Sequence, residues 1–582
     1  MKKIIFAFIL LITTIYPQKI SKDWKTFFEK SNYLSTPNYA QTIQYFEKLA
    51  KYSPFARLIT FGKSPQGRNL NCLIVSKDKA FSADAAKSTG KPILLIQNGI
   101  HAGEIEGKDA CMLLLREILV TKEQENLLDK MILLVIPIFN VDGHERISQY
   151  NRINQNGPTE MGWRTTAQNL NLNRDYMKAD APEMKFFLKL FNSWLPDFFI
   201  DTHTTDGQDF QYSVTYGIEK NGDVPPLTRD WIRNNYIPKM EKETEASGFK
   251  ILPYVGFKDG DLRKGLVDWV SGPRFSHGYS AIQNRPGLLI ETHMLKPYKE
   301  RVFATKAVIM STMNVVAQEN KKLVELNKTA DKYTIDTFAA GKKAFPLTFQ
   351  MDDKTSQKIY RGIESDQIDS WITGKKIIHY TGEPFDLEVP FFDEAVTKDS
   401  VFAPKGYLIP AEFANIVEIL KLHGIKVESI KKEKSFSVEK YKFKNVKFGF
   451  LPFEGRFQPH YEFDKSKETV TVPAGTFYVS VNQRTLGVIL HLLEPLGPDS
   501  FMKWGFFNTI FEQKEYFEDY SMEPIARKMA KENSQLKEEF LKKVESDEKL
   551  KNSVRQRLDF FYQRSPYADK ELNVYPILRV LN

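Results

Sequence analysis

Short apolar runs that alternate with helix-period stretches constrain the fold of the first 326 residues most strongly. Four strand-like segments, each with an apolar run, occupy residues 93–96, 131–140, 197–207 and 287–294, and helical periodicity covers 108–120, a stretch from Pro182, and 298–326. Strands that alternate with helices predict a sheet whose two faces are both covered by helices. We therefore expect an α/β fold with a mixed, largely parallel sheet flanked by helices.

The pattern changes after residue 327. Short strand-like runs separated by Pro, Gly and charged turns extend to about Val481, with one amphipathic helix at 411–424 among them. The rest of the chain has helical periodicity, and its Lys/Glu pattern is most simply a solvated helix face. We predict a signal peptide at 1–19, a first domain at 20–327, and a C-terminal accessory region at 328–582 that is β-rich and then helical.

The N-terminus and the overall composition limit the setting in which the protein works. Residues 1–19 have a basic start and an apolar core from Ile4 to Ile15 that is too short to span a bilayer comfortably. They predict a secreted or periplasmic protein, with the cleavage site left open and no transmembrane segment in the mature chain. A formal net charge of +9 spread over 582 residues predicts no nucleic-acid partner. Cys72 and Cys111 lack metal-binding spacing, which excludes a thiolate zinc site.

Side chains suited to metal binding and acid–base chemistry follow three of the apolar runs. His101 and Glu104 lie in a glycine-punctuated loop after residues 93–96, and His203 and Glu291 end two later runs. Ligands of open α/β sheets bind beyond the carboxyl ends of the strands. When such a histidine or glutamate occurs alone, it is most simply a side chain exposed to solvent in a loop or at a strand end. Its recurrence at equivalent strand ends indicates a single site.

Two histidines and one carboxylate, with a fourth position left open, are the ligands of a hydrolytic zinc site. We therefore predict one Zn²⁺ per chain, bound by His101, Glu104 and His203. The metal would polarise a scissile carbonyl and activate a water molecule, with Glu291 as the general base. His293 follows Glu291 by two residues and is expected to be a structural neighbour or a reserve ligand.

The order of these motifs resembles the zinc carboxypeptidases of the carboxypeptidase A type (peptidase family M14). The matching segments are NGIHAGEIEG, PIFNVDGHER, NLNRDY, DTHTTDG and LLIETH, all in family order. The resemblance covers about residues 24–326 and implies that 20–327 is a catalytic domain. It implies a zinc-dependent metallocarboxypeptidase that hydrolyses the C-terminal bonds of peptides or proteins. It also places the metal carboxylate at Glu104 and not at Glu106.

The resemblance further implies which residues hold the substrate. Asn173 and Arg174 would bind the terminal carboxylate, since a planar guanidinium binds a carboxylate through two parallel hydrogen bonds. An arginine near the metal would stabilise the oxyanion, and both Arg152 and Arg164 remain open for this catalytic role.

Several points stay open. No tyrosine clearly matches the family's substrate-capping residue, although Tyr279 and Tyr254 are alternatives, and the side-chain preference and oligomeric state cannot be read from the sequence. One alternative function is a zinc amidase or deacylase of N-acyl amino acids on the same scaffold. Another is a non-catalytic secreted protein that binds peptides or glycans.

Overall fold

The computed structural model describes residues 22–205 and 207–581, and the predicted signal peptide at 1–19 lies outside them. The chain divides into two compact units. One holds the residues up to Asp331 together with 350–396, and the other holds 332–349 and 397–582. The first unit therefore includes a segment, 350–396, from beyond the predicted division at 327/328.

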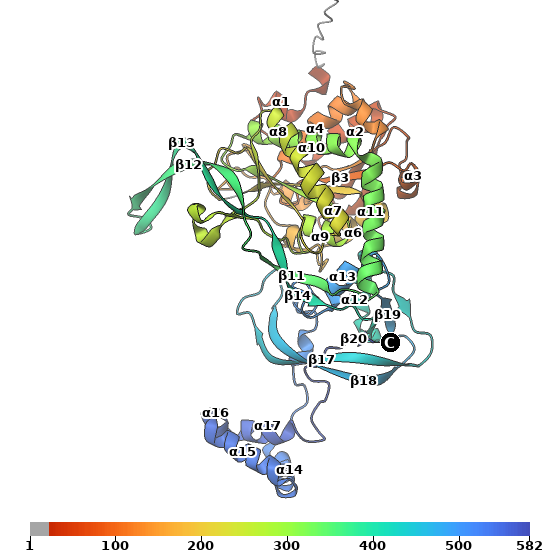
Figure 1. Cartoon of the computed structure of the whole chain (residues 1–582), viewed down its shortest axis with the longest axis vertical. Coiled ribbons are helices and arrows are strands. Elements are labelled where there is room, and N and C mark those ends of the chain that lie inside the picture. The colour runs from red at the N-terminus through yellow and green to blue at the C-terminus, as the bar shows by residue number, and fades with distance from the viewer. Residues whose placement is uncertain (1–21, 206, 582) are drawn as a thin grey trace, which may run out of the picture. The chain divides into compact units, whose positions relative to one another are not determined.

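An eight-stranded sheet forms the centre of the first unit (Figure 1). Its strands, in spatial order, are β1 (Ala56–Lys63), β2 (Asn69–Val75), β4 (Ile132–Ile136), β3 (Ile93–Gln97), β5 (Phe198–Thr205), β10 (Gly287–His293), β6 (Val214–Ile218) and β7 (Ile251–Pro253). The central strands β4, β3, β5 and β10 run parallel, whereas β1, β2 and β6 pair antiparallel with the neighbours nearer the centre. The predicted mixed, largely parallel α/β fold is confirmed.

Helices cover both faces of this sheet because successive residues of its strands point to opposite sides. On β5, the ring of Phe198 contacts Trp231 and Tyr236, whereas that of Phe199 contacts Phe187 and Phe191. The helices of this unit are α1 (Phe27–Lys30), α2 (Tyr39–Tyr52), α3 (Ala83–Ser88), α4 (Glu106–Leu119), α5 (Val141–Glu145), α6 (Pro182–Trp194), α7 (Pro226–Trp231), α8 (Ile237–Ala246), α9 (Ser276–Ile282) and α10 (Tyr298–Gln318).

Two helical regions differ from the prediction. None of the helices expected from the sequence lies within 216–278, but α7, a π-helical turn (Ile232–Tyr236) and α8 form a helical segment there. Polar residues and Pro238 interrupt its apolar periodicity. The single helix expected over 298–326 is divided at Glu319 into α10 and α11 (Asn320–Thr334). The side chain of Glu319 accepts hydrogen bonds from the side chains of Trp231 and Lys239.

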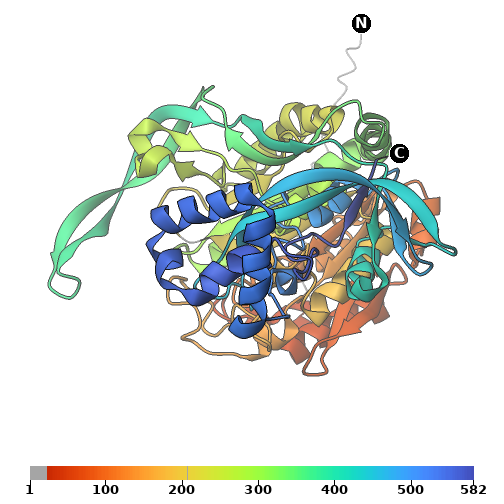
Figure 2. The same cartoon turned by 90° about the horizontal axis from the view of Figure 1, so that it is seen from below.

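A long hairpin adds a second sheet to the first unit. Strands β12 (Ser356–Ser370) and β13 (Lys375–Phe392) continue into β9 (Leu266–Val267) and β8 (Gly256–Phe257). The far end of the hairpin extends away from the rest of the unit (Figure 2). Only its base therefore bears on the site described below.

The second unit is β-rich and then helical, as predicted. Its six-stranded sheet has the order β16 (Glu428–Ser429), β19 (Phe477–Ser480), β15 (Gly406–Ile409), β20 (Leu578–Val580), β17 (Lys434–Phe448) and β18 (Pro459–Val472). Strands β11 (Phe345–Met351) and β14 (Ala395–Val401) pair separately, and the helices are α12 (Ala414–Leu422), α13 (Leu486–Leu493), α14 (Asp519–Glu532), α15 (Ser534–Ser546), α16 (Glu548–Asn552) and α17 (Val554–Tyr562). Within residues 22–581, apart from residue 206, no helix has the length and apolar character to cross a bilayer.

Candidate active site

The register of two parallel strands brings His203 and Glu291 together. His203 on β5 lies directly opposite Glu291 on β10, and Asp201 and Leu289 form the preceding pair on the same face. The two side chains therefore project from neighbouring strands at one level of the sheet. This single strand pairing thus brings together two residues that are nearly ninety positions apart in the sequence.

The loop between β3 and α4 supplies His101 and Glu104. Its backbone forms a turn in which the N–H of Glu104 donates a hydrogen bond to the carbonyl of His101 at 2.9 Å. Glycine is required at two places nearby. A Cβ on Gly107 would lie 2.1 Å from Thr202 Oγ1, and one on Gly103 would lie 2.8 Å from Arg152 Cγ. The loop can thus approach both β5 and the arginine.

Three electron-pair donors converge at the centre of the site. Glu104 Oε2 lies 3.1 Å from His101 Nδ1 and 3.0 Å from His203 Nδ1. Suitable ligand atoms of these three buried residues all lie within 4.8 Å of one another. This is the predicted ligand set, and the structure brings all three members together.

The outer nitrogens of both imidazoles are held by oxygen acceptors. His101 Nε2 donates to Asn171 Oδ1 at 3.0 Å, and His203 Nε2 donates to Asp201 Oδ2 at 2.8 Å. With the Nε2 atoms held in this way, both Nδ1 atoms face the carboxylate, which is the ring orientation that metal-ligating histidines adopt. Two imidazoles and one carboxylate fit a zinc ion better than a magnesium or calcium ion, which prefer oxygen ligands.

The protonation states of two ligands suit a cation. Burial lowers the pKa of His101 to about 4, so its imidazole is neutral near neutral pH. Burial opposes the ionisation of Glu104, but His101 and the guanidinium of Arg152 hold its pKa well below the ordinary value. Glu104 is therefore a carboxylate that is available to a metal.

Glu291 differs from Glu104 in its electrostatic setting. Removal from solvent raises the pKa of Glu291 to about 8, although the nearby His203 opposes this shift. A carboxyl group with a pKa near the working pH can both accept and return a proton. The environment of Glu291 is therefore suited to acid–base chemistry.

Both predicted oxyanion arginines reach the other oxygen of Glu104. Arg152 Nη2 lies 2.8 Å and Arg164 Nη1 lies 3.0 Å from Glu104 Oε1. The Arg152 side chain is 15% exposed and that of Arg164 is 41% exposed. The structure thus brings both arginines to the site and makes Arg152 the less solvated one.

Asn173 and Arg174 lie at one side of the ligand cluster, in a short 3₁₀ turn (Leu172–Arg174). Asn173 Nδ2 lies 3.5 Å from His203 Nε2, and Asn173 Oδ1 accepts a hydrogen bond from the backbone N–H of Ser276 at 3.3 Å. The Arg174 guanidinium stacks 4.5 Å from the ring centre of Phe275. An amide and a guanidinium are therefore placed beside the candidate metal ligands.

These residues line one cavity of about 620 Å³. The cavity contains every predicted site residue except Tyr279, namely His101, Glu104, Arg152, Arg164, Asn173, Arg174, His203 and Glu291. A volume of this size is typical of a small-molecule or peptide-end pocket.

The predicted substrate contact of Tyr279 is not supported by its position. Its side chain is fully buried, its ring packs against Tyr176 and Phe191, and its hydroxyl accepts a hydrogen bond from Gln283 at 2.8 Å. Tyr279 lies on α9, whose residues are all buried. The alternative residue, Tyr254, does line the cavity.

Two other residues considered from the sequence have structural partners. His293 Nε2 lies 2.8 Å from Asp209 Oδ1, which accepts the hydrogen bond, and the His293 ring packs on Phe210. Glu106 accepts hydrogen bonds from Thr204 Oγ1 at 2.7 Å and from Arg301 Nε at 2.7 Å. Neither side chain joins the ligand cluster.

Sequence reasoning missed the supporting and wall residues. Asp201 precedes His203 by two positions on a strand, and side chains two positions apart point to the same face. The sequence therefore allowed the prediction that Asp201 lies beside His203. Asn171 similarly precedes Asn173 by two positions. Trp269, Phe275 and His277 also line the cavity, and no spacing in the sequence relates them to it.

Known proteins resemble this chain at low sequence identity. Residues 42–228 match the sequence model of the zinc carboxypeptidase family, which confirms the resemblance indicated by the motifs. Carboxypeptidase 2 of Trichophyton rubrum is 23% identical over 467 residues, which cover 76% of this chain and 79% of that protein.

Solved structures of carboxypeptidases also match part of the chain. Carboxypeptidase A from Helicoverpa armigera is 17% identical, with a TM-score of 0.36 over 48% of this chain and 74% of that one. A metallo-carboxypeptidase from Pseudomonas aeruginosa is also 17% identical, with a TM-score of 0.37 over 49% of this chain and 69% of that one.

Proposed function

We propose that this chain, an enzyme of the zinc carboxypeptidase family, releases the C-terminal residue of peptides with one zinc ion bound by His101, Glu104 and His203. The observation that carries the proposal is the convergence of both Nδ1 atoms on Glu104 Oε2, beside Asn173 and Arg174 in one cavity. A metal site next to a carboxylate-binding pair suits a peptide end better than an internal peptide bond.

The chemistry divides between the metal and the surrounding side chains. Zinc, when bound, supplies a Lewis acid that polarises the scissile carbonyl and makes the attacking water more acidic. Glu291 takes a proton from that water and returns it to the leaving amine. Asp201 and Asn171 hold the ring orientation of the two histidines through their Nε2 protons.

The arginines have separate tasks in this proposal. Arg174 and Asn173 hold the terminal carboxylate, which positions the last peptide bond at the metal. Arg152 and Arg164 both contact Glu104, so their guanidinium groups lie where negative charge develops on the carbonyl oxygen. Tyr254 lines the same cavity and is available to cover the bound substrate.

We also propose that the enzyme acts outside the cytoplasm. The support is the basic and apolar segment at 1–19, which has the composition of a secretory signal.

Digestion of a peptide library, followed by mass spectrometry, tests this function. We expect sequential loss of single C-terminal residues, about one zinc ion per chain, and loss of release in Glu291→Gln without loss of zinc. His293→Gln is a matched control because it lies two residues along the same strand outside the cavity. Internal cleavage would contradict the carboxylate-binding pair. Preferred hydrolysis of N-acyl amino acids would support the amidase alternative instead.

A further inference from the structure

We propose that a second, apolar cavity beside the catalytic one binds a large apolar side chain of the substrate, about two residues upstream of the scissile bond. The inference rests on the proposed peptidase function and assigns part of its substrate preference. One part of the cavity wall, Tyr360, comes from the hairpin of β12 and β13.

The second cavity adjoins the first directly. It has a volume of about 300 Å³ and shares Thr205 and Tyr254 with the lining of the catalytic cavity. The two cavities therefore border one another, and we infer that a peptide bound in the first continues into the second. Both cavities lie within the first compact unit.

Among the described residues, which leave out position 206, the lining of the second cavity is mainly apolar and includes no charged side chain. Its apolar side chains include Phe210, Leu252, Val255, Phe257 and Tyr360. The catalytic cavity, in contrast, is lined by arginines and carboxylates. An apolar wall of this kind gains free energy from the burial of an aliphatic or aromatic side chain.

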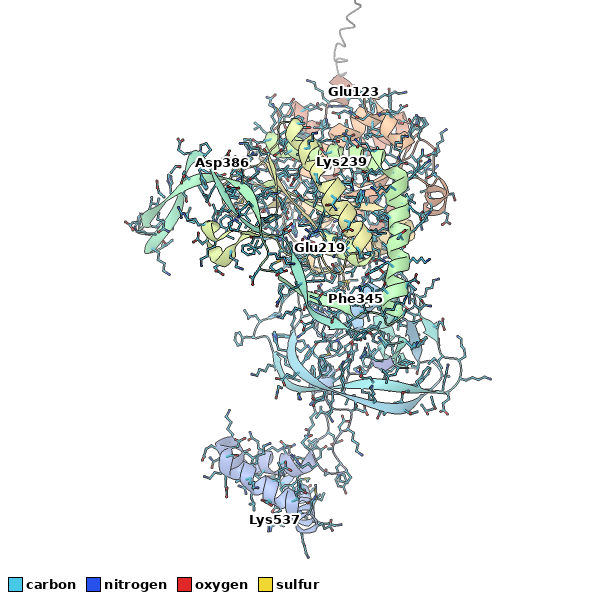
Figure 3. All side chains as sticks on the ribbon, in the orientation of Figure 1. Glu123, Glu219, Lys239, Phe345, Asp386 and Lys537 are labelled. Atoms are coloured by element: carbon cyan, nitrogen blue, oxygen red, sulfur yellow. The ribbon has the colours of Figure 1, made fainter. Side chains whose placement is uncertain are left out.

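Tyr360 comes from the hairpin and is fixed in place. Its ring packs edge-on against Phe257 with 5.6 Å between ring centres, and its side chain is 3% exposed. The base of the hairpin is anchored to the loop before β6. Tyr212 Oη donates to the carbonyl of Ile359 at 3.1 Å, and Gln211 Nε2 donates to Asp386 Oδ1 at 3.0 Å. Figure 3 labels Asp386 on this hairpin.

The order of residues along β5 shows which part of a peptide reaches the cavity. Asn173 contacts the Nε2 side of His203, the side that Asp201 also contacts. Thr205 lies two residues further along the strand, and its partner on β10, His293, packs on Phe210 of the second cavity. From this order we infer that the carboxylate pair and the second cavity lie on opposite sides of the proposed metal ligands.

The spacing sets the position of the bound residue. Two residues of a strand span about 7 Å, and a residue of an extended peptide spans about 3.5 Å. The side chain that enters the second cavity therefore belongs to the second residue on the acyl side, the one before the residue whose carbonyl is attacked.

Matched peptides test this assignment. In acetyl-X-Ala-Z, where Z is the terminal residue released fastest from the library, we expect kcat/KM for X = Phe to exceed that for X = Gly by about tenfold to a hundredfold. X = Asp should be the poorest. The shorter acetyl-Ala-Z does not reach the cavity and provides the baseline.

Variants of the wall make the test specific. Gly256 lines the cavity, has an ordinary φ, and would meet no atom within 4 Å on gaining a Cβ, so Gly256→Leu can fill the space without disturbing the fold. We expect Gly256→Leu and Tyr360→Ala to reduce the Phe-over-Gly ratio at least severalfold while hydrolysis of acetyl-Ala-Z stays unchanged. Ile359→Ala is the control, since Ile359 is 52% exposed and does not line the cavity.

The outcomes separate this inference from the proposed function. Release of C-terminal residues without any preference at X, or an unchanged preference in Gly256→Leu, would overturn the inference alone. A change in preference for Z in place of X would place the cavity on the other side of the scissile bond and would also overturn it. Failure to hydrolyse any peptide would contradict the proposed function itself.

Discussion

Glu104 accepts more of the site's polar contacts than any other predicted ligand. One oxygen faces the two histidine Nδ1 atoms and the backbone N–H of Thr204, and the other faces Arg152 and Arg164. In the proposed enzyme, a substitution at either arginine is therefore expected to affect the Glu104 carboxylate as well as the substrate. Metal content has to be measured together with activity.

The two arginines should not contribute equally. Arg152 is the more buried, and charges in a less solvated setting interact more strongly. We expect Arg152→Ala to reduce kcat by about 10² to 10³ and Arg164→Ala by about tenfold or less. Steady-state kinetics with zinc analysis checks this. Arg146→Ala is the control, because Arg146 stacks on Trp163 and does not line the cavity. A larger loss in Arg164→Ala would reverse the assignment.

If Glu291 is the general base, as proposed, activity should fall as the pH is lowered. Burial raises the pKa of Glu291 to about 8, and a dication beside it would lower that pKa. Because the carboxylate form is the base, kcat/KM should fall as the pH drops through an apparent pKa below 8. A pH profile of the zinc-loaded enzyme measures this limb. Activity that increases as the pH falls below 8 would contradict Glu291 as the base.

At the scale of elements, the site depends on how closely α4 approaches β5. Helix α4 begins two residues after Glu104, and Gly107 in its first turn leaves no room for a Cβ beside Thr202 and Asn98. Strand register then places Glu291 opposite His203. Ligand geometry is thus set by one helix–strand contact and one strand pairing.

Gly107→Ala tests this contact. The added methyl group would lie 2.1 Å from Thr202 Oγ1 and 2.2 Å from Asn98 Oδ1, so α4 or β5 has to move. We expect the free energy of unfolding to fall by about 1–3 kcal/mol, as in other overpacked cores, with weaker zinc binding. Urea denaturation and zinc titration measure these effects. Gly256→Ala should change neither quantity because its Cβ would meet no atom within 4 Å.

At the scale of the whole molecule, the chain divides into two compact units, and each unit contains buried apolar clusters of its own. In the second unit, a buried network joins Glu494 to Tyr441 at 2.7 Å and to Arg579 at 3.0 Å. Arg579 lies on the C-terminal strand β20, which pairs with β15 and β17 in the middle of the sheet. Strand β20 therefore supplies a central strand of this sheet.

Calorimetry should reveal two transitions that respond independently. Zinc should raise the transition of the first unit alone, because a ligand stabilises only the unit that binds it. Arg579→Met should lower the other transition, since removing one partner of a buried ion pair costs about 3–5 kcal/mol. Peptidase activity of Arg579→Met at low temperature should match that of the unaltered protein. One transition shifted by both changes would contradict independent units.

The sequence by itself determined the fold class and predicted which residues meet in the candidate ligand cluster. Apolar runs of strand length and their helical neighbours report burial, which is a local property of the chain. His101, Glu104, His203 and Glu291 follow such runs, so the common geometry of parallel strand ends was enough to bring them together. Asp201 was within reach of the same reasoning because strand alternation places it beside His203.

Only the tertiary structure decided which residues surround that cluster. Tyr279 has the residue type of a substrate contact, but the packing of α9 places it in the core. Tyr254, Trp269 and His277 line the catalytic cavity and come from the polar segment 216–278. Tyr360 lines the second cavity and comes from a hairpin nearly seventy residues after the last predicted site residue. Such neighbours depend on packing between distant segments, whereas periodicity reports whether a residue is buried and not what it is buried against.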